Sequence, residues 1–591
     1  MKSPYPLTEK IRSLHRARRE LLPVQDNRRL YLDIMEPIVT MAAGWLGENG
    51  AVIDPVFHQE WKQTTPRFVS SAAVLLRFGR CRELLDTVCR AMSYTASRLR
   101  DPAVRESSPD FWMRELATAY ACLQPLVAPE LAEQWKRDLA AVEPERCYRQ
   151  VDPTHTKIAD LANWSVYSSG GEAMRELLGI GGGPDFLWGN AFFETYVAGQ
   201  FDRFTEYGMY RDPNDPITYD ITTRLQLANA LFWGYRGRIA DELRELMIRG
   251  DLTALLFVSP EGLVPFGGRS DEFQFREGIV SALCELEAVR FKDSDPVLAG
   301  RFRRQARRSA SAILPWLRDD PPRHLKNRFP PSTRHGCDEY GQYSVYWLFA
   351  ASVFGLAALY ADDTIPEAAA FAETGGFALE LEPAFHKVFA NCGGNYVEID
   401  TCSDLHHDAT GLGRILLEGA PFGLLPAMPF ASERKYRVDP AFRPADVPAA
   451  IGPRGLAGVC DRRPEFTLGE ETPEKVAWHL VWTLDAEVLA QEYELTAAGL
   501  TVRCRRTDLK GAPLPLVFEV PVLDFDGREH ARWVVSGSTA EGALGAGGAV
   551  IRASAELHWA GEAMYANRNG IYRMLAFDAP AGVAEVRFAA K

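Results

Sequence analysis

Residues 476–484 (VAWHLVWTL) place large apolar side chains at the even positions and mostly small or polar ones between them. This period of two predicts an extended strand with one buried face. Far upstream, residues 28–46 (RRLYLDIMEPIVTMAAGWL) instead repeat their apolar residues every three or four positions, which predicts an amphipathic helix. The period changes between residues 362 and 375, so the chain is predicted to have a helical first part and a β second part.

The helical pattern recurs throughout the first part, and Pro, Gly and Asp clusters separate many of its segments. A dozen antiparallel helices with no strand between them favour an α-solenoid or a closed toroid, and the lack of a fixed-length repeat favours the toroid. We predict an (α/α)6-type toroid over residues 1–362. Further helices are expected at 66–78, 80–98, 110–126, 160–179, 185–206, 219–235, 239–257, 274–291, 298–317 and 341–361.

The second part, residues 375–591, is predicted to form an antiparallel β-sandwich-like domain. Residues 489–506 have the pattern of a hairpin that turns at 497–499, with Val502 and Cys504 on one face and Arg503 and Arg505 on the other. Residues 583–588 (VAEVRF) are expected to be a closing strand. The fold class is therefore α+β with two domains in sequence.

Composition and net charge argue against some classes of binding partner. The 591 residues are 47% hydrophobic and 25% charged, which is ordinary for a globular protein. Lys and Arg number 66 against 79 Asp and Glu, for a formal charge of −13. This acidity argues against a nucleic-acid or membrane partner, although a local arginine pocket can still bind an anionic substrate. No oligomeric state is indicated.

The N-terminal sequence, MKSPYPLTEKIRSLHRARRELL, has no apolar core of a secretory signal, and no apolar run is expected to cross a membrane. The ten cysteines are scattered, with no CxxC pair. We therefore expect a cytoplasmic protein with reduced thiols.

Three polar and aromatic loops, each placed before a predicted helix, are candidate sites, because loops at one rim of a toroid hold its chemistry. The first, residues 206–224, presents Tyr219 and Asp220 at a helix start. The second, residues 261–277, combines Arg269 and Arg276 with Asp271 and Glu272. Guanidinium groups bind a carboxylate in bidentate fashion, and carboxyl groups transfer protons.

The third loop, residues 334–347, brings acids and aromatic rings together. Rings provide a platform for sugar C–H faces, and acids bind hydroxyl groups or transfer protons. Its candidates are His335, Asp338, Glu339, Tyr340, Tyr343 and Trp347. Asp220, Asp271, Asp338 and Glu339 equally suit helix capping, which remains the competing interpretation.

Other polar clusters are weaker candidates. Asn163 and Trp164 could line the bowl or simply pack, and residues 58–67 form another polar and aromatic segment. The acids and histidines between Asp400 and Asp408 match no closed zinc site, so neither a metal nor any cofactor is expected. The chain has no GxSxG motif, and serine-hydrolase chemistry has no support.

At these segments the chain resembles a bacterial family catalogued as domain of unknown function 2264. The resemblance rests on residues 208–220 (GMYRDPNDPITYD), the turn 265–270 followed by Phe275 and Arg276, and residues 343–347 (YSVYW); residues 271–276 depart from the family's pattern. The family is associated with glycoside hydrolase family 154, whose characterised activity is exo-β-glucuronidase. The layout is also similar to heparinase II/III-like polysaccharide lyases.

The resemblance implies an enzyme that acts on uronic acids. The preferred hypothesis is hydrolysis of a terminal β-glucuronide in an oligosaccharide or glycoside. Glu339 and Asp220 would be the acid/base pair, with Asp271 and Glu272 as alternates. Arg269 and Arg276 would hold the substrate carboxylate; Tyr343, Trp347 and Trp164 would contact the sugar. Asp220, Arg269, Glu272, Glu339 and Trp347 are expected to line one concavity.

The alternative is a uronate lyase, which needs a base for the C5 proton and a group that neutralises the carboxylate. Tyr219, Asn163 and His335 or His406 are its candidates.

Overall fold

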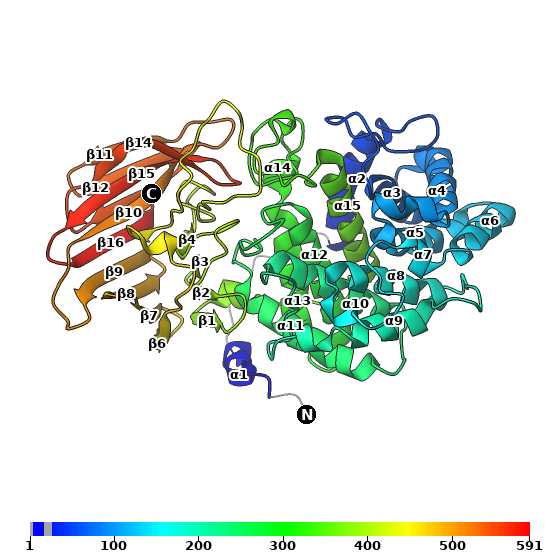
Figure 1. The fold of residues 1–591 in the computed structure, drawn as a ribbon, viewed down its shortest axis with the longest axis horizontal. Coiled ribbons are helices and arrows are strands. Elements are labelled where there is room, and N and C mark those ends of the chain that lie inside the picture. Colours follow the sequence, from blue (N-terminus) through cyan, green and yellow to red (C-terminus); the bar gives the residue numbers. More distant parts are fainter. Residues whose placement is uncertain (1–3, 17–26) are drawn as a thin grey trace.

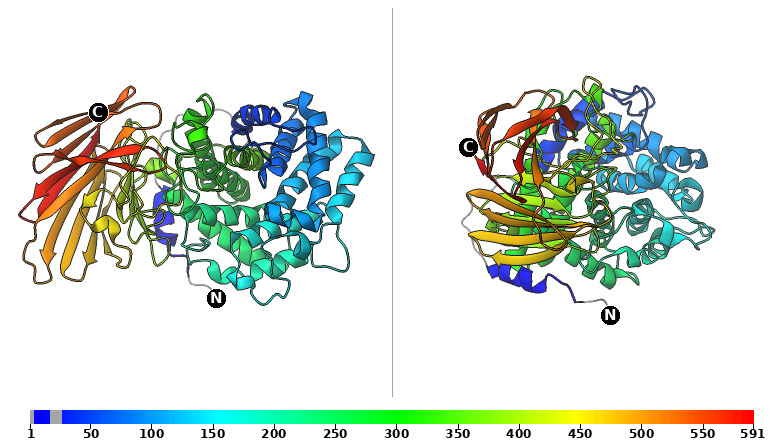
Figure 2. Two further views of the ribbon diagram at one scale, coloured as in Figure 1. Left: turned by 45° about the horizontal axis from the view of Figure 1, so that its top comes forward. Right: turned by 60° about the vertical axis from the view of Figure 1, so that its left-hand side comes forward.

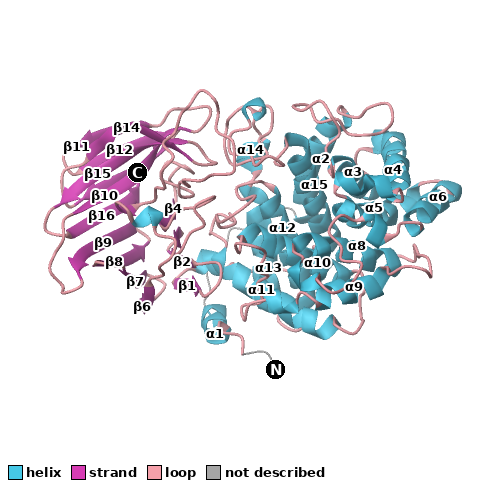
Figure 3. Ribbon diagram, viewed as in Figure 1, coloured by secondary structure: helices cyan, strands magenta, loops and turns pink. Residues whose placement is uncertain are grey.

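The computed structural model describes residues 4–16 and 27–591. Helices fill its first part and strands its second, with the two parts side by side (Figures 1 and 3). The α-helices are α1 (Thr8–Arg16), α2 (Asn27–Ala43), α3 (Thr64–Arg77), α4 (Leu85–Leu99), α5 (Trp112–Leu123), α6 (Pro129–Ala140), α7 (Pro144–Cys147), α8 (Asn163–Leu177), α9 (Gly189–Ala198), α10 (Ile217–Phe232), α11 (Ala240–Phe257), α12 (Phe275–Phe291), α13 (Pro296–Ala312), α14 (Leu314–Leu317), α15 (Tyr343–Tyr360) and α16 (Phe371–Thr374).

The strands begin three residues after the last helix ends. They are β1 (Phe377–Leu381), β2 (Lys387–Cys392), β3 (Asn395–Asp400), β4 (Gly411–Leu416), β5 (Gly452–Pro453), β6 (Glu465–Glu471), β7 (Lys475–Thr483), β8 (Glu487–Thr496), β9 (Gly499–Asp508), β10 (Leu516–Phe525), β11 (Arg532–Ser536), β12 (Thr539–Leu544), β13 (Gly547–Ala553), β14 (His558–Ala566), β15 (Ile571–Ala579) and β16 (Val583–Ala590). The predicted order of a helical part followed by antiparallel strands is confirmed.

Six helices of the first part contact one another in a closed series. Helix α3 packs against α5, α5 against α8, α8 against α10, α10 against α12 and α12 against α15, and α15 returns to α3. Their apolar faces belong to one large buried cluster. Packing of this kind turns the N-terminal ends of the six helices toward one region, which becomes important for the site.

Helix α15 corrects one prediction. Its residues Tyr343–Tyr360 are long and apolar enough to cross a membrane, although the sequence analysis found no such run. However, 94% of this stretch is buried inside the protein. Its neighbours α2, α3 and α12 cover it, as is usual for the central helix of a large core.

Other boundaries also differ from prediction. Helix α6 was not predicted, and the segment expected over 185–206 is helical only over Gly189–Ala198. The helix expected from residue 80 begins at Leu85, because a left-handed Cys81 and a short 3-10 turn come first. Turns of this kind depend on local backbone angles, which the spacing of apolar residues does not predict.

The strands form three antiparallel sheets. The first has the order β1-β2-β3-β4, the second β14-β15-β10-β5 and the third β11-β12-β13-β16-β9-β8-β7-β6. Buried side chains from the second and third sheets share one core, as in a sandwich. Figures 1 and 2 show the first sheet between the other two sheets and the helices, and buried side chains of the first sheet join the same core.

Two strand predictions are confirmed in detail. Trp478 and Trp482 on β7 are fully buried, and β8 pairs with β9 through a turn that joins Thr496 to Gly499. On β9, Val502 and Cys504 are buried while Arg503 and Arg505 are exposed. Burial on alternate positions therefore fixed the register.

Candidate functional site

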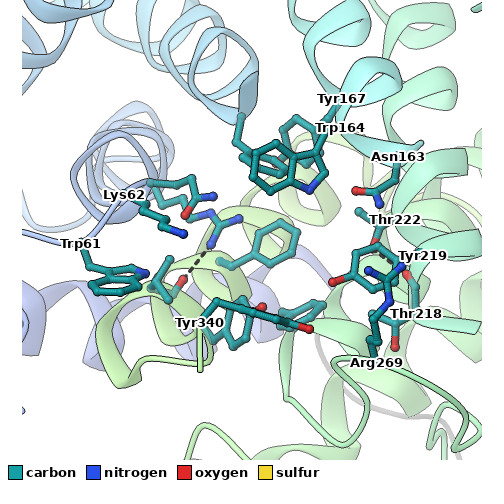
Figure 4. Close-up of a pocket in the computed structure, with 17 residues that line it drawn as sticks. Trp61, Lys62, Asn163, Trp164, Tyr167, Thr218, Tyr219, Thr222, Arg269 and Tyr340 are labelled. Carbon is teal, nitrogen blue, oxygen red and sulfur yellow. Dashed lines mark hydrogen bonds between the residues drawn. The ribbon is translucent and has the colours of Figure 1, made fainter. Parts of the chain in front are cut away.

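A pocket of about 180 Å³ lies where the six ring helices begin (Figure 4). Each helix contributes a residue from its first turns or from the loop just before it. The lining residues are Trp61, Lys62, Gln63, Arg67, Phe111, Asn163, Trp164, Tyr167, Thr218, Tyr219, Thr222, Arg269, Phe275, Tyr340, Val345, Tyr346 and Phe349. Because a helix N-terminus carries a partial positive charge, this convergence favours an anionic ligand.

On one wall of the pocket, Asn163 and Arg269 are both hydrogen-bonded to Asp212, which is not itself part of the lining. The backbone N–H and Nδ2 of Asn163 each donate to Asp212 Oδ1 at 3.0 Å. The Arg269 guanidinium donates to the other carboxylate oxygen of Asp212. Asp212 is almost fully buried, whereas the Arg269 side chain is 33% exposed. Asp212 therefore orients both groups while leaving part of the guanidinium free to meet a ligand.

Tyr219 lies directly beside this group. Its ring sits under the Arg269 guanidinium, 4.6 Å from the guanidinium carbon, and its hydroxyl is 3.0 Å from Ser270 Oγ. Burial raises the pKa of Tyr219, while Arg269 and the Ser270 hydroxyl oppose this rise. Ser270 Oγ also donates to Tyr340 Oη at 3.1 Å.

The opposite wall is cationic and aromatic. Figure 4 shows Trp61 and Lys62 across the pocket from Asn163, Tyr219 and Arg269. Burial and the nearby Arg149 lower the pKa of Lys62. Two further rings, those of Trp164 and Phe111, meet edge to face at 4.9 Å and line the side between the two walls.

Arg67 completes the cationic lining. Its guanidinium lies 4.0 Å from the Phe349 ring centroid and donates to the Val345 carbonyl oxygen at 3.0 Å. Burial lowers its pKa. Among the residues that the structure describes, the pocket lining contains two arginines and a lysine but no aspartate or glutamate.

Five of the predicted site residues line this pocket: Asn163, Trp164, Tyr219, Arg269 and Tyr340. The expectation that Asp220, Arg269, Glu272, Glu339 and Trp347 share one concavity is wrong for all but Arg269. Glu339 is exposed, and Trp347 is fully buried with its indole N–H donating to the Pro322 carbonyl oxygen at 3.2 Å.

Asp220 and Glu272 are instead fully buried partners of arginines. Asp220 accepts two hydrogen bonds from Arg224, at 2.8 and 3.0 Å, and one from the Tyr210 backbone N–H at 2.7 Å. Glu272 accepts from Arg414 on β4 at 2.6 Å and from Asn569 at 3.1 Å. Both oxygens of each carboxylate are engaged by these partners, so neither side chain is placed to exchange a proton with a substrate.

Asp271 and Asp338 lie outside the pocket lining. Arg568, from the loop between β14 and β15, contacts Asp271 at 2.6 Å and Asp338 at 3.3 Å. Asp271 also accepts from the Gly267 backbone N–H at 3.1 Å. These contacts fix the turn that carries Arg269 and the loop that carries Tyr340.

The remaining candidates have structural partners. Arg276 donates to the Pro265 carbonyl oxygen, and the Tyr343 hydroxyl donates to that of Pro322 at 2.8 Å. His335 is buried and bonds the β domain at both ring nitrogens. The His406 side chain is 42% exposed and lies 3.1 Å from the Glu433 carboxylate. None of these four lines the pocket.

The sequence analysis did not single out Asp212, Lys62 or Gln63. Asp212 belongs to the loop 212–216 (DPNDP) inside the candidate segment 206–224, in which only Tyr219 and Asp220 were chosen as site residues. No local pattern marks it, because its two partners lie 49 and 57 residues away along the chain. The segment 58–67, noted for its polar and aromatic residues, did supply Trp61 and Arg67.

No family model and no curated protein sequence matches the chain. Among solved structures, the chain is similar to a chondroitin AC lyase of Streptomyces coelicolor A3 in complex with chondroitin sulphate, at 13% identity and a TM-score of 0.47, over 98% of this chain and 82% of that one.

Two other similar structures are also of carbohydrate enzymes. A chondroitinase AC lyase with oligosaccharide complexes matches at 11% identity and a TM-score of 0.42, over 95% of this chain and 82% of that one. Endoglucanase CelQ from Clostridium thermocellum, complexed with cellotriose, matches at 11% identity and a TM-score of 0.31, over 96% of this chain and 93% of that one. Likeness at this level does not assign a function to the chain.

Proposed function

We propose that this chain is a lyase that cleaves a uronic-acid-containing saccharide by β-elimination. The observation that carries the proposal is a pocket in which Asn163, Tyr219 and Arg269 meet without a carboxylate in the lining. We also take the six-helix ring to be the inner layer of an (α/α) toroid.

The charge of the pocket supports an anionic substrate. Arg67, Arg269 and Lys62 face a space toward which six helix N-termini point, although the whole chain carries a formal charge of −13. A uronate carboxylate fits this field and matches the planar donors of Arg269. The rings of Trp61 and Trp164 provide the apolar surfaces against which sugar C–H faces pack.

In the proposed reaction Arg269 and Asn163 hold the C6 carboxylate and stabilise the negative charge that develops on it. Tyr219, as the phenolate, takes the C5 proton. The C5–H electron pair becomes the C4=C5 double bond, the C4–O bond breaks, and its electron pair leaves with the departing oxygen. A proton from Tyr219 or from solvent then neutralises that oxygen.

Two-carboxyl hydrolysis, the preferred hypothesis from sequence, has less support. Glycoside hydrolysis of that kind needs a carboxyl on each side of the scissile bond. Asp220 and Glu272 are engaged by buried arginines, and Glu339 is exposed. Recognition of a uronate is common to both hypotheses, and the reaction type separates them.

To decide between the two hypotheses, the protein is incubated with a panel of uronic-acid polysaccharides, and the ultraviolet absorbance of an unsaturated product is followed. Release of nitrophenol from a nitrophenyl glucuronide is measured in parallel. We expect absorbance without nitrophenol. Tyr219→Phe should abolish the signal, whereas Tyr565→Phe, on β14 of the sandwich, should retain it. Nitrophenol release without an unsaturated product would establish hydrolysis and contradict the proposal.

A further inference from the structure

Ser270 occupies an unusual position beneath the pocket. It is 1% exposed and has a φ of 59°, in the left-handed region that a non-glycine residue seldom adopts. Its hydroxyl lies 3.0 Å from the Tyr219 oxygen and 3.1 Å from the Tyr340 oxygen. Two phenols from different segments of the chain thus share one serine hydroxyl.

The hydrogen-bonding capacity of serine limits this arrangement. A hydroxyl donates one hydrogen bond and accepts two, so only one of the two phenols receives the Ser270 proton at any time. In the structure Ser270 donates to Tyr340. The orientation of the Ser270 hydroxyl therefore determines which tyrosine oxygen is stabilised as an acceptor.

We infer that Ser270 is a positioning residue whose hydroxyl turns to donate to the Tyr219 oxygen when that phenol has lost its proton. The inference rests on the proposed function, in which Tyr219 is the base. When the Tyr219 phenolate takes the C5 proton it becomes a donor again, and Ser270 can return to Tyr340. No net proton is gained or lost by Ser270 in this exchange.

The charges around Tyr219 show why a neutral donor is needed. Arg269 faces the ring and favours the phenolate, but Asp212 already neutralises much of its charge. Asp338 opposes ionisation from the loop before α15. The remaining polar groups facing the tyrosine cluster are Tyr340 on that loop, Tyr346 on α15 and Arg67 on α3. Ser270 is a neutral donor whose hydroxyl lies within hydrogen-bond distance of the Tyr219 oxygen, so it can donate to the phenolate without adding charge.

Backbone geometry also points to a role for the hydroxyl. A left-handed non-glycine residue costs about 1 kcal/mol or more, and strain of this kind persists where the surroundings enforce it. Glycine would adopt this conformation without strain, as Gly268 does nearby at a φ of 75°. The surroundings do enforce it: the next residue, Asp271, is held by Arg568 at 2.6 Å and accepts from the Gly267 backbone N–H at 3.1 Å.

The test measures ionisation separately from turnover. A fluorinated tyrosine is placed at position 219, and its pKa is read from the fluorine resonance in the otherwise native chain and in Ser270→Gly and Ser270→Ala. Loss of a hydrogen bond to a charged oxygen should raise that pKa by about one to two units in both variants. Ser108→Gly is the matched control: Ser108 is also buried and left-handed (φ 54°), but its hydroxyl has no hydrogen-bond partner among residues 4–16 and 27–591.

A second variant should move the pKa the other way. Tyr340→Phe removes the resting acceptor of the Ser270 proton, so the hydroxyl becomes free to donate to Tyr219 and the pKa of the fluorotyrosine should fall. The acidic limb of the kcat/KM profile should shift in the same direction as the pKa in each variant. Such opposite shifts would not follow from a general loosening of the turn.

Each outcome has a distinct meaning. Equal pKa increases in Ser270→Gly and Ser270→Ala support the inference. An increase in Ser270→Ala alone would assign the effect to backbone strain and overturn it, as would an unchanged pKa in both. If the pKa shifts as expected but no saccharide yields an unsaturated product, the link between Ser270 and Tyr219 stands and the proposed function fails.

Discussion

Lowering the pH should destabilise this protein through His335, a histidine that joins its two parts. His335 is 2% exposed and stacks on Phe329, with ring centroids 3.8 Å apart. Its Nε2–H donates to the Asn567 carbonyl oxygen at 2.9 Å, and its Nδ1 accepts from the Asp439 backbone N–H at 3.2 Å. Protonation of Nδ1 would remove the acceptor and bury a charge, so the folded state favours the neutral ring.

The size of the effect follows from linkage. Burial lowers the pKa of His335 to about 4 in the folded state, against an ordinary value of 6.5. Below pH 6.5 the unfolded chain therefore binds the proton more readily, and stability is lost as the pH falls toward 4. Between about pH 8 and about pH 5 the loss from this one group amounts to about 2 kcal/mol.

Urea unfolding at the two pH values, on the native chain and on His335→Gln, measures this contribution. The variant should be less stable at the higher pH, but it should lose about 2 kcal/mol less than the native chain on acidification. His530→Gln is the control, since that side chain is 69% exposed. A variant with the same pH dependence as the native chain would show that His335 is not held neutral in the folded state.

Three further predictions concern the site and its supports. Arg269→Ala should lower kcat/KM on a uronate substrate by about two orders of magnitude, because it removes charge-assisted hydrogen bonds to the carboxylate. Arg269→Lys should restore only part of this activity. An equal loss of kcat/KM on a neutral analogue would mean that Arg269 has a purely structural role. Arg568→Met should reduce the free energy of unfolding by about 3–5 kcal/mol in denaturant titrations, since it leaves Asp271 and Asp338 buried without their cation. The control is Arg587→Met, which should change the free energy of unfolding little because the Arg587 side chain is 60% exposed. Activity should survive dialysis against a chelator, because the proposed steps use phenol, amide and guanidinium groups; loss of activity that added metal restores would refute this.

The sequence by itself determined the order of the two parts and much of the strand register. Apolar side chains stand at every second position of β7 and β9, so each strand has one apolar face. A shift in register by one residue would expose that face to solvent, so burial of the face determines the register. The helical stripes likewise predicted most of the long helices, because an apolar stripe must be covered by a neighbour. Local composition also directed attention to the segments that carry Trp61, Asn163, Tyr219 and Arg269.

Only the tertiary structure decided which polar residues are available for chemistry. The sequence predicts Asp220 and Glu272 as catalytic acids, yet in the structure each forms an ion pair with a buried arginine. For Glu272 that arginine is Arg414, 142 residues further along the chain. A carboxylate's role depends on the charges within a few ångströms of it, and those charges come from segments whose proximity no local pattern encodes.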